Sequence, residues 1–329
     1  MICPKCQTTN PDEYRYCFQC GTRLGERRRG TRAKGSVRDM MARGIALFNE
    51  GNFRSALEEF RMSTSLDPSH ELSHLYAAAC NLALGELAFA RDAAERALEL
   101  NPELQGATFL MGILEALQEE KVKACAYFSR CHELNPEFAL PLHWAGSLLM
   151  GEEKFSEAVP LVDKLLRKKP DSPAAYYMSG VLALEKGDST QAVSHLEKAI
   201  ELSENFTAAY RKLAEAYLRI GRKEKAAEHY AKAIELDPDD VDSIFQLGTV
   251  LSDLRDVEGA IEMFRKALSI NPEFAEAHYQ IGLLLYVEKG IVDEAIAELE
   301  MALELDPTDP SARLILGELL HVKKSERHE

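Results

Sequence analysis

Two pairs of cysteines near the start of the chain carry the clearest chemistry in the sequence. Cys3 and Cys6 form one C-x2-C pair, Cys17 and Cys20 form a second, and ten residues separate the two pairs. Four thiolates at this spacing suit a tetrahedral zinc ion, with sulfur–metal bonds of about 2.3 Å. A segment this short has no hydrophobic core, so the metal would supply its folding free energy. We expect one structural Zn²⁺, whose four filled positions leave none open for catalysis.

Two other chemistries could use the same thiolates. Redox-active or disulfide-forming pairs are disfavoured, because we expect a cytosolic chain and find no βαβ pattern beside the cysteines. Iron in a rubredoxin-like site would need more fold around it than ten intervening residues provide. Zinc is therefore the favoured metal on ligand type and spacing.

A second motif, His70-Glu71-Leu72-Ser73-His74, matches the H-E-x-x-H helix of zinc proteases. No third ligand is obvious, and the repeat pattern described below places His70 in the turn that follows Pro68. We therefore interpret the segment as the start of a helix, with Ser69 as its N-cap. The sequence has no Walker loop, Rossmann fingerprint or nucleophile elbow, and we expect no enzymatic activity.

Basic residues gather between the cysteines and the rest of the chain. Residues 1–36 carry eight basic and three acidic side chains, a net charge of +5; the whole chain carries −15, which leaves −20 for the remainder. The basic segment could contact the phosphates of DNA or RNA. A solvated linker, or docking onto the acidic remainder of the chain, explains the same charges. The residues that would contact nucleic acid are Arg27, Arg28, Arg29, Arg32 and Lys34.

Regularly spaced prolines organise the larger part of the chain. Four of them, Pro68, Pro102, Pro136 and Pro170, follow one another at intervals of 34 residues. A period of this length indicates stacked pairs of helices. With proline at position 32, the first of eight units begins at Val37. Each of the eight has Gly or Ala at position 8 and Ala at position 20. Small residues at these positions let two helices pack closely, and a larger residue at position 24 fills the space beside them.

These features resemble the tetratricopeptide repeat family, whose repeats have a small residue at position 8, Ala at 20, Phe at 24 and Pro at 32. The resemblance implies an all-α fold, a right-handed α-solenoid of eight helix-turn-helix units over residues 37–309. Residues 310–329 are expected to form a capping helix and a polar tail that hide the last exposed face. The start of the chain is similar to short zinc ribbons, matching them at Asn10, Tyr16, Gly21 and Leu24. The predicted domains are then a zinc ribbon over 1–25, a basic flexible linker over 26–36, the repeats and the cap.

The resemblance also implies a binding groove. In this family the first helix of each repeat lines the concave face, mainly through positions 2, 5, 9 and 12. We expect an amphipathic helix or an extended apolar segment of a protein partner to bind there, or of a second copy of the chain. Arg211 and Arg219 would contact acidic residues that flank this segment. The implied groove residues are Met41, Ile45, Phe48, Leu75, Phe109, Ile113, Tyr177, Val181, Arg211, Arg219, Phe245 and Tyr279.

Composition argues against membrane insertion and secretion. Hydrophobic residues make up 46% of the chain, as in folded proteins, but no apolar run reaches the roughly 18 residues that span a bilayer. The N-terminus lacks the apolar stretch of a secretory signal. We expect a cytoplasmic, non-enzymatic scaffold for protein interactions. The alternative is a nucleic-acid-associated regulator, in which the zinc ribbon and basic linker contact DNA or RNA while the repeats recruit protein.

Overall fold

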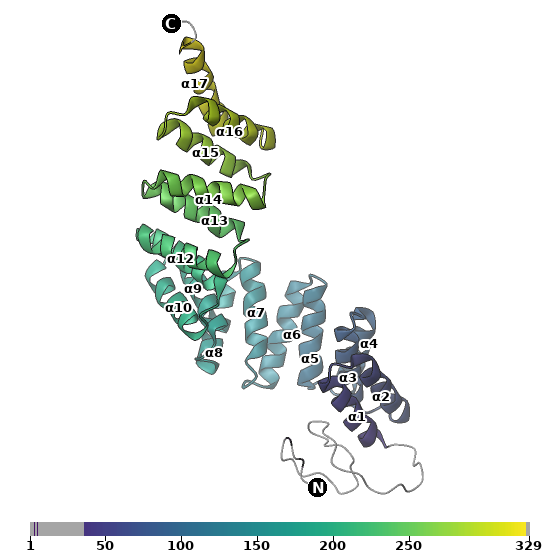
Figure 1. Ribbon diagram of the computed structural model, residues 1–329. Helices are drawn as coiled ribbons and strands as arrows, with labels where there is room; N and C mark the ends of the chain where they lie inside the picture. Colours follow the sequence, from purple (N-terminus) through teal and green to yellow (C-terminus); the bar gives the residue numbers. More distant parts are fainter. Residues whose placement is uncertain (1–2, 4, 6–35, 327–329) are drawn as a thin grey trace. The chain divides into compact units, whose positions relative to one another are not determined.

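The computed structural model describes residues 3, 5 and 36–326, and the chain divides into two compact units, residues 1–168 and 169–329. All regular secondary structure in the described residues is helical, and Figure 1 shows the helices of each unit following one another in pairs. The helices of the first unit are α1 (Val37–Asn49), α2 (Phe53–Leu66), α3 (Glu71–Ala83), α4 (Leu87–Leu100), α5 (Gln105–Leu117), α6 (Lys121–Leu134), α7 (Leu140–Gly151) and α8 (Phe155–Lys168).

The second unit continues the same alternation of first and second helices and ends with one unpaired helix. Its helices are α9 (Pro173–Glu185), α10 (Ser189–Leu202), α11 (Thr207–Arg219), α12 (Lys223–Leu236), α13 (Val241–Asp253), α14 (Val257–Ile270), α15 (Ala275–Val287), α16 (Val292–Leu305) and α17 (Pro310–Glu326). Eight helix pairs followed by a further helix confirm the predicted fold class.

Glycine at position 8 lets the two helices of a repeat approach each other. A Cβ atom built on Gly44 would lie 2.5 Å from a ring carbon of Phe60, which is too close for any side chain. The glycine therefore makes room for the large residue at position 24, as the sequence pattern predicts. The same relation recurs at Gly112 with Phe128 (2.6 Å), Gly180 with Leu196 (2.6 Å), Gly248 with Phe264 (2.7 Å) and Gly282 with Leu299 (2.8 Å).

The turn between the two helices of each repeat passes through a residue with left-handed backbone. This residue stands at position 15 of every repeat, counting the one-residue insertion in the eighth, and its φ ranges from 57° at Glu153 to 82° at Gly187. Glycine adopts this conformation at little cost and occupies five of the eight turns. The other three turns hold Glu119, Glu153 and Arg255, which bear the strain of a Cβ atom in this region.

Some first helices contact the next first helix as well as their own second helix. Within the first unit α1 contacts α3 and α3 contacts α5, and within the second unit α9 contacts α11. Within the described residues successive second helices make no contacts of this extent, and neither do α5 with α7, α11 with α13, α13 with α15 or α15 with α17. We call the side of each unit on which its first helices carry the predicted groove positions the inner face.

Candidate functional site

Six predicted groove residues lie on the inner face of the first unit. Met41 and Ile45 belong to a buried cluster that also contains Phe60, so they serve the core of the first repeat. Four others are half-buried and keep part of their surface accessible: Phe48, Leu75, Phe109 and Ile113. The accessible part of this face therefore begins at the end of α1 and continues over α3 and α5.

The other six lie in the second unit. Tyr177, Val181 and Tyr279 are half-buried, whereas Phe245 is buried among residues of the last repeats. Arg211 and Arg219 keep 39% and 41% of their side-chain surface exposed. This face thus mixes apolar and charged side chains, where the first unit offers mainly apolar ones.

Position 5 of a first helix packs on position 34 at the end of the same repeat. In the third, fifth and seventh repeats both residues are aromatic, and their ring centroids lie 4.8–5.4 Å apart. These pairs fix the orientation of the position-5 rings and cover part of their surface. Sequence reasoning missed them, although one partner recurs every 68 residues. The pairs are Phe109–Phe138, Tyr177–Phe206 and Phe245–Phe274.

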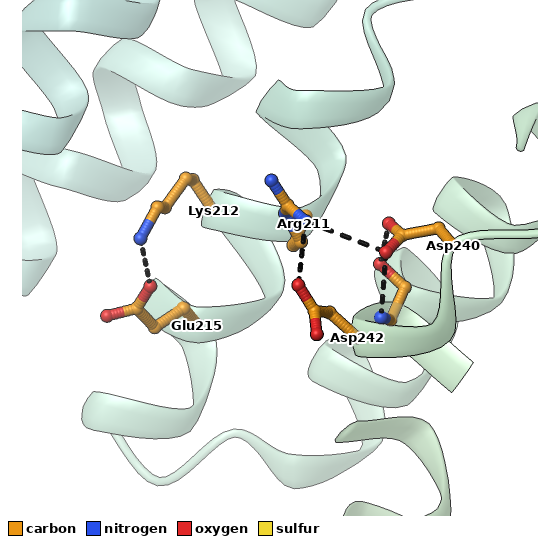
Figure 2. A network of polar contacts seen from close by, with 6 residues as sticks. Arg211, Lys212, Glu215, Asp240 and Asp242 are labelled. Atoms are coloured by element: carbon orange, nitrogen blue, oxygen red, sulfur yellow. Dashed lines mark hydrogen bonds and ion pairs between the residues drawn. The ribbon is translucent and has the colours of Figure 1, made fainter. Parts of the chain in front are cut away.

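In the sixth repeat the same two positions carry opposite charges. One terminal nitrogen of Arg211 lies 3.6 Å from an Asp240 carboxylate oxygen and 3.6 Å from an Asp242 oxygen (Figure 2). Asp240 also caps α13, because it accepts hydrogen bonds from the backbone N–H of Ser243 at 3.2 Å and from its hydroxyl at 2.6 Å. Arg211 therefore occupies the place that an aromatic ring takes in neighbouring repeats, with the exposed Asp242 as a second partner.

A second group of charges lies one turn further along α11. Glu215 accepts from Lys212 at 2.8 Å and from Arg219 at 2.6 Å, and Figure 2 shows the first of these contacts. Burial alone would raise the pKa of Glu215, but the hydrogen bond and charge of Lys212, together with Arg219, hold it below its ordinary value. Arg219 also donates to the Leu184 carbonyl in the last turn of α9 at 2.6 Å. Both arginines are thus engaged by the chain itself, Arg219 through shorter contacts than Arg211.

Four large apolar side chains remain exposed on first helices of the first unit: Leu72, Leu117, Leu140 and Trp144. Leu72 on α3 and Leu140 on α7 stand at position 2 of their repeats, and Trp144 stands one turn further along α7. Their exposed fractions lie between 39% and 44%. The indole of Trp144 stacks on Phe128, with ring centroids 6.0 Å apart, so its orientation is set while one side stays open. Leu117, the last residue of α5, is 55% exposed, and the other three stand at position 2 or one turn beyond it.

The H-E-x-x-H segment starts α3, as predicted, but its N-cap is His70 and not Ser69. The Nδ1 atom of His70 accepts from the backbone N–H of Ser73 at 3.3 Å, whereas Ser69 bonds to the Asp67 carboxylate instead. His74 contacts the Pro68 carbonyl at 3.1 Å. Both histidines thus serve the turn, and within the described part of the chain no three His, Cys, Asp or Glu side chains gather closely enough to hold a metal.

The predicted zinc site and basic segment fall almost wholly outside the described residues. Cys3 is described and is fully buried. Cys6, Cys17 and Cys20 lie outside, as do Arg27, Arg28, Arg29, Arg32 and Lys34. Four cysteine thiols are a donor set that suits zinc, and their assignment as ligands stays a prediction. Among the described helices, none is both long and apolar enough to cross a bilayer.

Family comparisons match both parts of the chain. A model described as "Tetratricopeptide repeat" matches residues 41–105, 145–205, 179–241 and 245–310, which is more than half of the sequence. A model described as "zinc-ribbon domain" matches residues 2–24, the segment that holds all four N-terminal cysteines. No curated protein matches the chain.

Solved structures with the same architecture include YrrB, described as a TPR protein with an unusual peptide-binding site. YrrB is 25% identical over 60% of this chain and 97% of its own, with a TM-score of 0.51. The Cut9–Hcn1 complex of APC/C aligns with 86% of this chain at 19% identity and a TM-score of 0.56, and this chain spans 55% of that one. PilF of Pseudomonas aeruginosa aligns over 69% of this chain and 99% of its own, at 16% identity and a TM-score of 0.57. The last two likenesses concern the fold alone.

Proposed function

The chain belongs to the tetratricopeptide repeat family, and we propose that it is a non-enzymatic adaptor that binds a segment of a partner protein on its inner face. The segment is an amphipathic helix or an extended apolar peptide. The likeness to YrrB, a repeat protein with a peptide-binding site, supports this kind of ligand. The four cysteines bind one structural zinc ion, in keeping with the zinc-ribbon match over residues 2–24. Reduced thiolates of this kind persist in the cytoplasm, where we place the protein.

The observation that carries the proposal is the exposed apolar surface on α3 and α7. Leu72 and Leu140 stand at position 2, one of the expected groove positions, Trp144 stands one turn further along α7, and each leaves about two fifths of its surface in water. Leu140 and Trp144 lie one turn apart on α7, and exposed apolar surface of this kind commonly marks an interaction site. Trp144 is already held against Phe128, so a partner that covers it would lose little side-chain entropy.

Charge on the second unit supports a carboxylate in the partner. Arg211 meets Asp240 and Asp242 at 3.6 Å each, near the long end of the ion-pair range, and Asp242 is strongly exposed. We propose that a partner carboxylate replaces Asp242 beside Arg211, because Asp242 is already solvated and loses little by the exchange. Arg219, held by two contacts of 2.6 Å, positions Glu215 and the end of α9 and contributes less to binding.

The chain contains a single tryptophan, which makes the site visible to a direct assay. Peptides that lack tryptophan would be selected from a displayed library with the full chain as bait. Binding over Trp144 is expected to move its fluorescence emission to shorter wavelength. Leu72→Glu and Leu140→Glu together should weaken the selected peptides by at least about tenfold, the loss of roughly 1.4 kcal/mol.

The matched control uses exposed apolar residues of second helices. Phe89 on α4 and Val122 on α6 are even more exposed than Leu72, and they belong to the opposite member of each helix pair. Phe89→Glu and Val122→Glu together should leave affinity within about twofold. Equal losses in the two double variants, or an emission spectrum that does not respond to bound peptide, would refute the proposed location.

A further inference from the structure

Helix α17 has the sequence register of a ninth first helix. Arg313, Leu316, Gly317 and Leu320 stand at its positions 4, 7, 8 and 11, which in the other repeats face the second helix of the same repeat. On its opposite side Ala312 and Leu319 are fully buried against the eighth repeat. We call the four residues at positions 4, 7, 8 and 11 the open face.

Among the described residues Arg313, Gly317 and Leu320 of the open face lie exposed, whereas Leu316 is half-buried and packs against the last repeats. A Cβ atom built on Gly317 meets no other atom within 4 Å, whereas one on Gly282, the same position in the eighth repeat, would lie 2.8 Å from Leu299. Leu320 is 47% exposed, whereas its counterpart Leu285 is 3% exposed. An end cap of a repeat array normally has a polar outer surface. In this helix Gly317 and Leu320 instead stay exposed at positions where the other repeats pack a second helix.

The open face continues into a hollow between α16 and α17. The hollow has a volume of about 690 Å³ and is lined by Asp293, Ile296, Ala297 and Glu300 of α16 and by Leu320, Lys323 and Lys324 of α17. Lys323 forms an ion pair with Asp293 across it. The hollow leaves part of Leu320 accessible from the side of α16.

We propose that the open face binds an amphipathic helix of a partner protein, which completes a ninth repeat in trans. The eight complete repeats define the chemistry of that helix. It carries a large apolar residue to fill the space over Gly317, as Phe60 does over Gly44. It has small residues four positions before and three positions after this residue, as Ala56 and Ser63 flank Phe60.

The residue just before the large apolar one is a glutamate. Position 4 of a first helix meets position 23 of the second helix: His278 contacts Glu298 at 2.6 Å, and the rings of Tyr176 and His195 lie 5.9 Å apart. In the ninth repeat position 4 is Arg313, an exposed side chain that donates to the Pro307 carbonyl. A guanidinium at this place selects a carboxylate at position 23 of the incoming helix.

Charge favours a partner helix over a second copy of α17. A symmetric pair of α17 helices crossing at Gly317 would bring Arg313 and Lys324 of one copy near the same basic surface of the other. A second copy cannot supply one of its second helices either, because their small and large packing residues, such as Ala56 and Phe60, are already fully buried. A helix presented by another protein meets neither obstacle.

A peptide with the sequence of residues 53–66, FRSALEEFRMSTSL, serves as the probe because it contains the complete pattern in Ala56, Glu59, Phe60 and Ser63. Fluorescence anisotropy of the labelled peptide with the full chain should show saturable binding. Replacing Phe60 by Lys in the peptide, or Gly317→Leu in the chain, should weaken it by at least about tenfold. Gly317→Leu should leave the helical circular dichroism unchanged, because the space beside Gly317 is open.

A charge exchange and an independent readout complete the test. Arg313→Glu should weaken the peptide, and a peptide with Glu59→Lys should recover binding to that variant. Binding of this peptide should leave the Trp144 emission unchanged, and the Leu72→Glu, Leu140→Glu double variant should bind the peptide as tightly as the unmodified chain. Both results separate this surface from the proposed inner-face site. Absence of saturable binding, or binding that Gly317→Leu leaves intact, would overturn the proposal. A dimer of the chain alone in sedimentation that Gly317→Leu dissociates would overturn the partner helix in favour of a second copy.

Discussion

Replacing the position-8 glycine by alanine should have opposite effects in two adjacent first helices. At Gly282 a new Cβ atom would lie 2.8 Å from Leu299 Cγ and 3.2 Å from the Ala295 carbonyl oxygen. The second of these neighbours is backbone and cannot move without shifting α16. At Gly317 the same atom meets nothing within 4 Å. The two substitutions are chemically identical, so their difference measures only what covers each glycine.

The magnitudes follow from two opposing terms. Alanine in place of glycine stabilises a helix interior by about 1 kcal/mol, and this gain applies at both sites. Overpacking a helix interface costs about 1–3 kcal/mol, and this cost applies only at Gly282. Repeat six tolerates Ala214 opposite Tyr230, which argues for the middle of that range. We expect Gly282→Ala to destabilise the eighth repeat by about 1 kcal/mol and Gly317→Ala to stabilise α17 by about 1 kcal/mol.

Local hydrogen exchange is the appropriate assay, because long repeat arrays do not unfold in a single two-state step. Amides of α15 and α16 should exchange about fivefold faster in Gly282→Ala, and amides of α17 about fivefold slower in Gly317→Ala, where 1.4 kcal/mol corresponds to tenfold. Faster exchange in α17 after Gly317→Ala would show that the open face is covered, and would refute the reasoning at both sites.

Three further predictions concern the turns, the metal and the charge network. Glu119→Gly and Glu153→Gly should each stabilise their repeats by about 0.5–1 kcal/mol, because both residues have positive φ, and Gly187→Ala should destabilise; local exchange in the adjoining helices checks both signs. Cys17→Ser with Cys20→Ser should reduce bound zinc from one per chain to none by elemental analysis while leaving the helical circular dichroism nearly intact, because repeats contact only their neighbours. Glu215→Gln should cost about 1 kcal/mol at neutral pH. Since the pKa of Glu215 is lowered in the folded chain, its contribution is present above the ordinary value of 4.5 and is lost as the pH falls below it, so the variant should show a flatter acid unfolding profile.

The helix pairs could be predicted from the sequence because their signals are spaced by the repeat itself. Proline at position 32 and small residues at positions 8 and 20 place each helix within a few residues of its observed bounds. The turn at position 15 could be predicted only in the repeats where glycine occupies it, such as Gly51 and Gly85. Glu119 and Arg255 adopt the same left-handed backbone, but their residue types do not indicate it. Glutamate and arginine occur in many backbone conformations, so their presence at position 15 does not indicate a left-handed turn.

The inner face was harder to predict, because one side chain can serve the fold and a ligand at once. Position 5 looks accessible on a helical wheel, yet the ring of Phe109 packs against Phe138, which covers part of its surface. The signal was available as a double period: aromatic residues at position 34 recur every second repeat, at Phe138, Phe206 and Phe274. A search at 34 residues averages these with polar residues such as Asp240 and loses them.

Repeats also make an unoccupied contact informative in a way that a unique fold does not. The contact between positions 8 and 24 is seen repeatedly within one chain, with Phe or Leu opposite glycine. The contact between positions 4 and 23 recurs with different chemistry, as in His278 with Glu298. Gly317 and Arg313 stand at positions 8 and 4 of α17, without partners at positions 24 and 23. The other repeats show which residue classes occupy those two partner positions and how they are spaced. The inner face offers no such internal standard, because no repeat shows it filled, and its ligand must be found by selection and not by analogy.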